Sequence, residues 1–229
     1  MRWKRDEIIE AVYRLLVTIP PNVIVVAAAK QRTLDEVETV VQAGITHIGH
    51  NYIHEAQEMV PTLGDKATWH MIGHLQRNKT AHAARLFDMI ETLDSVRLAA
   101  KIEGHCAQTG KVMPVLIEVN SGREPNKTGI LPEEAEDIVV AIADMEHIRI
   151  KGLMTMGPIS NNPEEFRPYF RATRQVFDRL SALTLPNVTM RYLSMGMSDS
   201  YQIALEEGAN IVRIGIKLFG PRDTKPKKN

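Results

Sequence analysis

Val23-Ile24-Val25-Val26-Ala27-Ala28-Ala29-Lys30 is an apolar run of β-strand length that ends on a single lysine. A strand without polar alternation is buried on both faces, as in the parallel sheet of an α/β protein. Lys30 would then lie at the carboxyl end of a buried strand, where the active sites of such folds are placed. Burial among alanines favours a neutral amine, so Lys30 is a candidate Schiff-base former. The alternative is that Lys30 only caps the strand and reaches water along its stem.

The composition bounds the class of protein. The 229 residues include 28 basic and 28 acidic side chains, and this balance argues against binding of nucleic acid or of an anionic membrane through bulk charge. The single cysteine, Cys106, cannot form an internal disulfide, which suits a reducing compartment. The sequence shows no apolar run of membrane-spanning length and no signal-peptide core. We therefore expect a cytoplasmic protein.

Strand-like and helix-like segments alternate along the whole chain. The strands are expected near residues 26, 48, 71, 89, 116, 151, 191 and 212, each separated from the next by one helical segment. Eight such units predict a single closed (β/α)8 TIM barrel spanning residues 1 to 222, with a doubly wound sheet as the alternative. Apolar residues at helical spacing predict an extra helix within the leading segment, residues 1 to 19. The polar tail, 223 to 229, is predicted to be disordered.

In a barrel the residues that follow each strand meet at one rim. From the first strand to the eighth, these are Lys30, Asn51, Gly73-His74, Thr92 with Asp94, Asn120-Ser121, Thr155, Ser194-Met195-Gly196, and Arg213 with Gly215. Glycines and hydroxyls concentrate after strands seven and eight, in Ser194-Met195-Gly196-Met197-Ser198-Asp199 and Gly215-Ile216. Exposed amides and a helix start there predict a phosphate site, unless these are ordinary turn residues.

Arg213 lies between Val212 and Ile214 in a buried strand, where an unpaired guanidinium is costly. Its acceptor is either a structural carboxylate or the ring nitrogen of an aromatic cofactor. Pyridoxal 5′-phosphate would complement all three features: it has an aldehyde for Lys30, a phosphate for the glycine-serine turns and a pyridine nitrogen for Arg213.

Residues 20 to 222 also resemble the pyridoxal phosphate homeostasis proteins (the YggS or PROSC family), relatives of the N-terminal barrel domain of alanine racemase. The matching motifs are Lys30 at its strand end, Gly49-His50-Asn51-Tyr52-Ile53-His54-Glu55-Ala56, Trp69-His70-Met71-Ile72-Gly73-His74-Leu75-Gln76-Arg77-Asn78-Lys79, Gly152-Leu153-Met154-Thr155-Met156, Ser194-Met195-Gly196-Met197-Ser198-Asp199 and Val212-Arg213-Ile214-Gly215. The resemblance implies a cofactor on Lys30, a phosphate held around Ser194, Gly215 and Ile216, and Arg213 facing the pyridine nitrogen. Asn51 would line the same pocket.

Three positions depart from the pattern of the family. Ala29 stands where the family usually has serine, His50 where it has glutamate, and Ile216 where it has threonine. Alanine racemases commonly carry isoleucine at the position of Ile216, whose backbone amide still serves the phosphate. We therefore expect a weaker grip on the phosphate and the same ligand.

The nature of Arg213 bears on turnover. Arginine keeps its proton, so opposite the ring nitrogen it would leave the pyridine unprotonated and weaken the cofactor as an electron sink. The resemblance likewise implies a carrier of pyridoxal phosphate that serves vitamin B6 homeostasis and supplies pyridoxal-phosphate-dependent apoenzymes, with little catalysis. We expect a monomer, because no second domain for dimerisation is predicted. No catalytic residue is assigned.

Three other classes of function compete with the carrier. A single-domain amino-acid racemase would need a second base, for which His74, His50 and Tyr52 are candidates, although racemases supply it from a further domain that we expect a chain this short to lack. An aldolase would use Lys30 without a cofactor. A metal hydrolase is disfavoured, because the histidine pairs spaced by four lie in strands and loops, without an HExxH pattern. Lys127 is expected on a solvated face.

Overall fold

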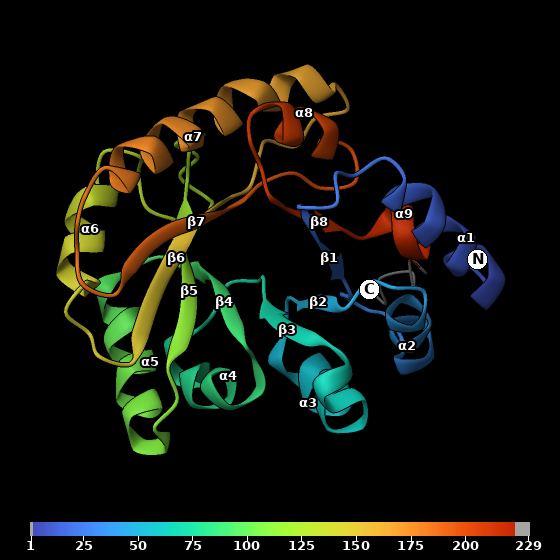
Figure 1. Cartoon of the computed structure of the whole chain (residues 1–229), viewed down its shortest axis with the longest axis horizontal. Coiled ribbons are helices and arrows are strands. Elements are labelled where there is room, and N and C mark those ends of the chain that lie inside the picture. The colour runs from blue at the N-terminus through green and yellow to red at the C-terminus, as the bar shows by residue number, and fades with distance from the viewer. Residues whose placement is uncertain (1, 223–229) are drawn as a thin grey trace, which may run out of the picture.

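The computed structural model describes residues 2–222 and shows eight parallel strands closed into a barrel (Figure 1). In chain order around the ring, the strands are β1 (Ile24–Ala28), β2 (His47–His50), β3 (Thr68–Met71), β4 (Met89–Leu93), β5 (Met113–Val119), β6 (Ile148–Thr155), β7 (Val188–Ser194) and β8 (Ile211–Ile214). Each of the eight predicted strands is present, so the barrel prediction is confirmed and the doubly wound sheet is wrong.

Helices surround the strands on the outside of the ring (Figure 1). They are α1 (Arg5–Leu16), α2 (Leu34–Gln42), α3 (Ile53–Leu63), α4 (Thr80–Leu86), α5 (Val96–Thr109), α6 (Ala135–Ile142), α7 (Arg167–Ser181), α8 (Tyr201–Glu206) and α9 (Ile216–Phe219), with 3-10 turns at Gly64–Lys66, Arg77–Lys79 and Pro163–Phe166. The predicted leading helix is α1, which packs against α2 and α9. The short helix α9, directly after β8, was not predicted.

Local sequence signals set the ends of these helices. Thr33 opens α2 with a capping box: its hydroxyl accepts from the Glu36 amide, and the Glu36 carboxylate accepts from the Thr33 amide at 2.7 Å. Ser95 caps α5 by accepting from the Leu98 amide, and Gly110 ends that helix in the left-handed conformation. The caps at Thr33 and Ser95 fix where α2 and α5 begin, and therefore how long the loops are that precede these helices at the rim.

The apolar side chains form two layers. A small inner layer fills the barrel, and its buried members are Val26, Ile72, Met89, Leu116, Met154 and Ile211. A larger outer layer lies between strands and helices. Among the polar side chains that interrupt the buried strands are Glu91, Glu118, Ser194 and Arg213. Because these polar groups are buried, their interactions define the candidate site.

Closure of the barrel brings the first and last strands together. Val26 pairs with Arg213, and Ala27 pairs with Ile214. The loop that carries Lys30 therefore lies next to the loop that begins at Gly215, as expected from strand order in a closed barrel.

Within the described residues, the structure contains no helix long and apolar enough to cross a membrane. The tail predicted to be disordered, 223 to 229, lies outside the described residues.

The contact between β6 and β7 depends on a glycine. Gly152 has φ +147°, and a Cβ there would lie 1.8 Å from the carbonyl oxygen of Tyr192. We expect Gly152→Ala to lower the free energy of unfolding by about 3 kcal/mol, because backbone on both strands must move. The control is Gly104→Ala in α5, where a Cβ meets nothing within 4 Å. This change should stabilise the chain slightly, because alanine loses less conformational freedom than glycine in a helix. Urea denaturation of both variants checks this; equal midpoints for Gly152→Ala and the unmodified chain would contradict it.

Candidate functional site

Lys30 lies in the turn that follows β1, two residues beyond the last strand residue, Ala28. The buried Ala29 continues the pairing by donating its amide to the Gly49 carbonyl at 2.8 Å. Gln31 then adopts φ +60°, and its amide donates to Glu55 Oε1 at 2.9 Å. A non-glycine residue in this conformation is strained, and such strain concentrates at functional sites. The half-buried Lys30 thus lies at the rim in a turn that hydrogen bonds fix on both sides, at Ala29 and at Gln31.

Arg32 joins this turn to the end of the barrel. Its buried guanidinium donates to the carbonyls of Phe219, at 3.2 Å, and Gly220, at 2.6 Å. It also lies 3.6 Å from Glu36. Because α9 directly precedes Gly220, these contacts fix the loops after β1 and β8 relative to each other.

A hydroxyl and several amides gather after β7 and β8. Ser198 Oγ accepts from the amides of Gly215, at 3.3 Å, and Lys217, at 3.4 Å. Gly196, in the preceding turn, has φ +86°, and a Cβ there would lie 2.6 Å from the Ala204 Cβ. The turn therefore requires glycine. Backbone amides beside a hydroxyl are the chemistry that holds a phosphate, so these residues fit that group.

The phosphate prediction named two serines, and the structure separates them. Ser198 lies with the amides of Gly215 and Lys217, whereas Ser194 is fully buried at the end of β7 and bonds to Arg213 and Glu91. Ile216 is 53% exposed at the start of α9. The predicted cluster therefore consists of Ser198, Gly215 and Ile216, and Ser194 belongs with Arg213.

Arg213 is 3% exposed and has protein acceptors. It donates to Ser194 Oγ at 2.6 Å, to the Thr155 carbonyl at 2.8 Å and to Met156 Sδ at 3.5 Å. Glu91 Oε2 lies 3.8 Å from Arg213 Nη1. The sequence left open whether a carboxylate or a cofactor serves Arg213, and the structure contains the carboxylate. The need for an acceptor is therefore no argument for a cofactor, although a guanidinium with five N–H donors can also serve a further acceptor.

Glu91, in β4, is the centre of a buried hydrogen-bonded chain. Burial alone raises the pKa of its carboxyl, but hydrogen bonding to His70 and Ser194 and the charges of His70 and Arg213 outweigh burial and hold the pKa below its usual value. The ionised carboxylate only accepts, so His70 Nδ1, at 2.7 Å, and Ser194 Oγ, at 2.6 Å, must both donate to it. The Ser194 hydroxyl, which donates its hydrogen bond to Glu91, accepts a hydrogen bond from Arg213. The carboxylate thus fixes the orientation of the bonds that hold the guanidinium.

The chain extends beyond His70. His70 Nε2 lies 2.9 Å from Nδ1 of His47, the first residue of β2. Burial, assisted by the charge of His70 and opposed by those of Glu91 and Asp88, lowers the pKa of His47 to about 4. His47 is therefore neutral at physiological pH and adds no positive charge to the interior.

Asn51 directly follows β2 and lies against the turn after β3. A Cβ at Gly73 would be 2.4 Å from the Asn51 carbonyl oxygen, so only glycine allows this approach. Asn51 lines two neighbouring hollows at the rim, of about 570 and 280 Å³. It is thus available to a bound molecule.

The nominated bases lie in different surroundings. His50 is fully buried, and neither of its ring nitrogens has a hydrogen-bond partner within residues 2–222; its Nδ1 is 3.8 Å from Glu55. His74 is half exposed, 3.7 Å from Asp94. The Tyr52 ring centroid lies 5.1 Å from Lys30 Nζ, which places the amine over the face of the aromatic ring. The described part of the chain holds no group of three or more metal-ligating side chains.

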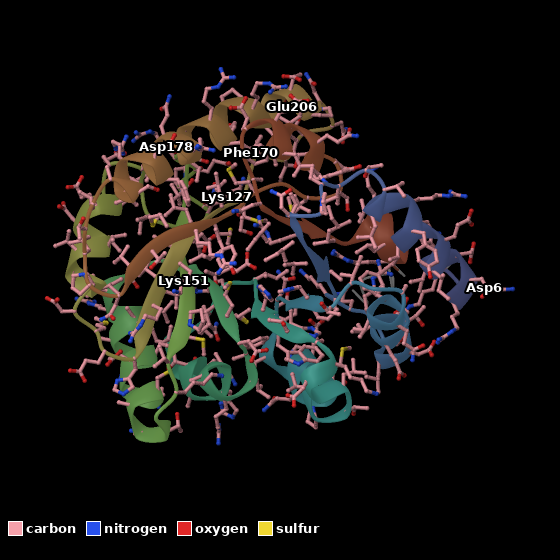
Figure 2. All side chains as sticks on the ribbon, in the orientation of Figure 1. Asp6, Lys127, Lys151, Phe170, Asp178 and Glu206 are labelled. Atoms are coloured by element: carbon pink, nitrogen blue, oxygen red, sulfur yellow. The ribbon has the colours of Figure 1, made fainter. Side chains whose placement is uncertain are left out.

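Three residues of the site were missed from the sequence or placed wrongly. Glu91 and Glu118 were not predicted, because they lie inside β4 and β5, whereas the predicted site residues were mostly those just beyond each strand. A carboxylate in a strand whose every residue is buried, such as β4, is rare enough to have been a signal. Lys127, labelled in Figure 2, was expected on a solvated face, which is wrong: it is part-buried, lines the smaller hollow, and donates to Glu124 and to the Gly157 carbonyl.

Comparison with known proteins agrees with this geometry. The model of the family described as "Alanine racemase, N-terminal domain" matches residues 9–223. The "Pyridoxal phosphate homeostasis protein" of Aquifex aeolicus is 39% identical over 180 residues, 78% of each chain. The structure of PipY from Synechococcus elongatus "with PLP bound" is 29% identical, with TM-score 0.86 over 93% of this chain and 100% of PipY.

A more distant comparison shows the fold alone. Alanine racemase from Corynebacterium glutamicum is 18% identical, with TM-score 0.75, covering 95% of this chain and 62% of the racemase. The protein is therefore a barrel of the alanine racemase N-terminal-domain class. Within that class, the chain belongs to the family of pyridoxal phosphate homeostasis proteins.

We expect Glu91→Gln to lower the free energy of unfolding by about 3–5 kcal/mol at pH 7. An amide presents a donor to one of two groups that must donate, and it leaves Arg213 without its counter-charge. Because the folded-state pKa of Glu91 is lowered, its contribution is present above the ordinary glutamate pKa of about 4.3 and is lost as pH falls through the folded value.

Urea denaturation at stepwise lower pH measures this contribution. The difference between the unmodified chain and Glu91→Gln should shrink in acid, while Glu10→Gln, which removes an exposed partner of Arg14, should change little at any pH. Equal stability at pH 7, or a difference that stays constant into acid, would show that Glu91 does not hold the network as an anion.

Proposed function

We propose that the chain binds pyridoxal 5′-phosphate as a Schiff base on Lys30 and serves intracellular pyridoxal phosphate homeostasis, the process for which its curated relatives are named. The observation that carries the proposal is the convergence, on adjacent strands, of Lys30, Arg213 and the Ser198–Gly215 cluster. The PipY structure with its cofactor supports the same reading, since that relative aligns over its whole length.

The residues have distinct roles in this proposal. When bound, pyridoxal phosphate supplies an aldehyde carbon to which an amine adds. Lys30 is that amine, and the braced turn at Gln31 holds it at the rim. Ser198 and the amides of Gly215 and Ile216 hold the phosphate. Arg213, oriented by Ser194, faces the ring nitrogen.

Asn51 and the departures complete the site. Asn51 forms the wall on the side of β2 and β3. At Ile216 only the backbone amide serves the phosphate, and at Ala29 no hydroxyl is present, so the grip on the phosphate is weaker than with serine and threonine in these places. The ligand that the site accepts is still pyridoxal phosphate in this proposal.

We assign the chain a carrier role, with little turnover. Arg213 keeps its proton and is charge-balanced by Glu91, so it does not protonate a ring nitrogen as a carboxylic acid would. The proposal includes a cytoplasmic monomer that releases the cofactor to pyridoxal-phosphate-dependent apoenzymes. The buried free thiol of Cys106 is compatible with a reducing compartment.

Titration of the purified chain with pyridoxal phosphate tests the proposal. Lys30→Ala should abolish the yellow Schiff-base absorbance and weaken binding roughly tenfold or more, because the covalent tether is lost. The control is Lys66→Ala, which removes an exposed lysine far along the chain and should bind as the unmodified protein does. Unchanged absorbance in Lys30→Ala would overturn the assignment. Sustained solvent-deuterium exchange at the α-carbon of added amino acids would count against the carrier and favour a racemase-like enzyme.

A further inference from the structure

A small cavity lies beside the proposed cofactor site, at the carboxyl ends of β2 to β6. Its volume is about 280 Å³, the lower end for a small-molecule pocket, and its wall includes Asn51, Gly73, Thr92, Glu118, Asn120, Lys127, Thr128 and Met156. Asn51 belongs to the proposed cofactor site, and Met156 contacts Arg213. The cavity therefore adjoins that site, on the side away from Ser198 and Gly215.

Glu118 presents an unsatisfied oxygen in this cavity. The residue is 5% exposed; its Oε1 accepts from the Thr128 hydroxyl at 2.8 Å, whereas its Oε2 is buried without a hydrogen-bond partner anywhere in residues 2–222. A buried carboxylate oxygen without a donor is costly, so such a group in a cavity indicates a missing donor.

Several other polar side chains of the cavity wall are already engaged. Thr92 donates to the Gly73 carbonyl, and Lys127 donates to Glu124 and the Gly157 carbonyl. The side chain of Asn120 bonds through both its ends to the backbone of Glu124. The wall also includes Asn51, His74 and Asn126, and no side chain of the described residues donates to Glu118 Oε2.

The wall that carries Glu118 is preformed. The chain after β5 folds back, so that the Asn120 amide donates to the Ile130 carbonyl and the Ile130 amide to the Glu118 carbonyl, each at 2.8 Å. Gly129, at φ +102°, allows this return, because a Cβ there would lie 2.9 Å from the Asn120 nitrogen. The carboxylate is therefore held in place before any ligand arrives.

The charge balance favours a cationic donor. Arg213 interacts with both Glu91 and Glu118, but Glu91 lies 3.8 Å away and is held by the Ser194 bridge. Burial, with the charge of Asp94, raises the pKa of Glu118 despite the Thr128 hydrogen bond and the charges of Arg213 and His74. Glu91 thus has His70, Ser194 and Arg213 as close partners, whereas no cationic side chain of residues 2–222 lies within 4 Å of the Glu118 carboxylate.

We propose that this cavity is a binding subsite for a small primary ammonium group, with Glu118 Oε2 as its acceptor. An ammonium group supplies both a donor and a positive charge, and charge-assisted hydrogen bonds are the strongest available to a carboxylate. The ammonium belongs either to a free amino acid or to a lysine side chain of another protein. Asn51 is shared with the proposed cofactor site, but the acceptor Glu118 has no role in the cofactor assignments, so the subsite can be tested by itself.

Calorimetric titration of the full chain, with no pyridoxal phosphate added, tests the subsite. The probes are L-alanine, Nα-acetyl-L-lysine amide, and propionate, which has no ammonium group. The variants are Glu118→Gln, which keeps the shape but removes the charge, and Glu133→Gln, which removes an exposed carboxylate whose partner is Arg123.

We expect the unmodified chain and Glu133→Gln to bind at least one ammonium probe equally, and Glu118→Gln to bind it roughly tenfold more weakly or worse. Propionate should not bind. Binding of L-alanine alone identifies free amino acids, and binding of the lysine amide alone identifies a protein lysine. If no ammonium probe binds, or if Glu118→Gln binds as tightly as the unmodified chain, the subsite is wrong. Pyridoxal phosphate titration is independent of this result, so the two proposals fail separately.

Discussion

A buried arginine that needs acceptors and a counter-charge is the constraint on which this site depends. Arg213 occupies the barrel interior, where an isolated guanidinium is prohibitively costly. Glu91 offsets its charge from 3.8 Å, with the Ser194 hydroxyl between them, and His70 orients the carboxylate from the other side. The arrangement uses side chains from β3, β4, β7 and β8, so it forms only when the ring closes. Stability of the fold and geometry of the site are therefore coupled.

The second requirement is a lysine delivered to the same end of the barrel. Strand order achieves this, because β1 pairs with β8 and places Lys30 beside the loop after Arg213. The strained Gln31 and the buried Arg32, which reaches the carbonyls of Phe219 and Gly220, then fix that loop. In this way Lys30 meets Arg213, which is 183 residues later in the sequence, because their strands are neighbours. The Ser198 hydroxyl joins them through its bond to the Gly215 amide.

The fold could be predicted because all the strands, and all the helices except the short α9, have local sequence signals: apolar runs, caps and glycines. The rim residues Lys30, Asn51 and Arg213 followed from strand ends alone. The partners of Arg213 could not be predicted this way, because Glu91 and Ser194 are 103 residues apart and meet only across the barrel. The distinction between Ser194 and Ser198 likewise depends on where β7 ends: Ser194 is its last residue and is buried, whereas Ser198 lies in the following turn, and strand ends are the least predictable feature of a sequence. Lys127 was misplaced because a loop that folds back over the rim resembles an ordinary solvated loop.

The central claim is that one amine, that of Lys30, carries the cofactor. Borohydride reduction of the chain saturated with pyridoxal phosphate, followed by proteolysis and mass spectrometry, measures this directly, because reduction makes the imine permanent. The account predicts a single pyridoxyl group on the peptide that contains Lys30. A modification on another lysine, such as Lys127 or Lys217, or no modification in a chain that binds the cofactor, would contradict it.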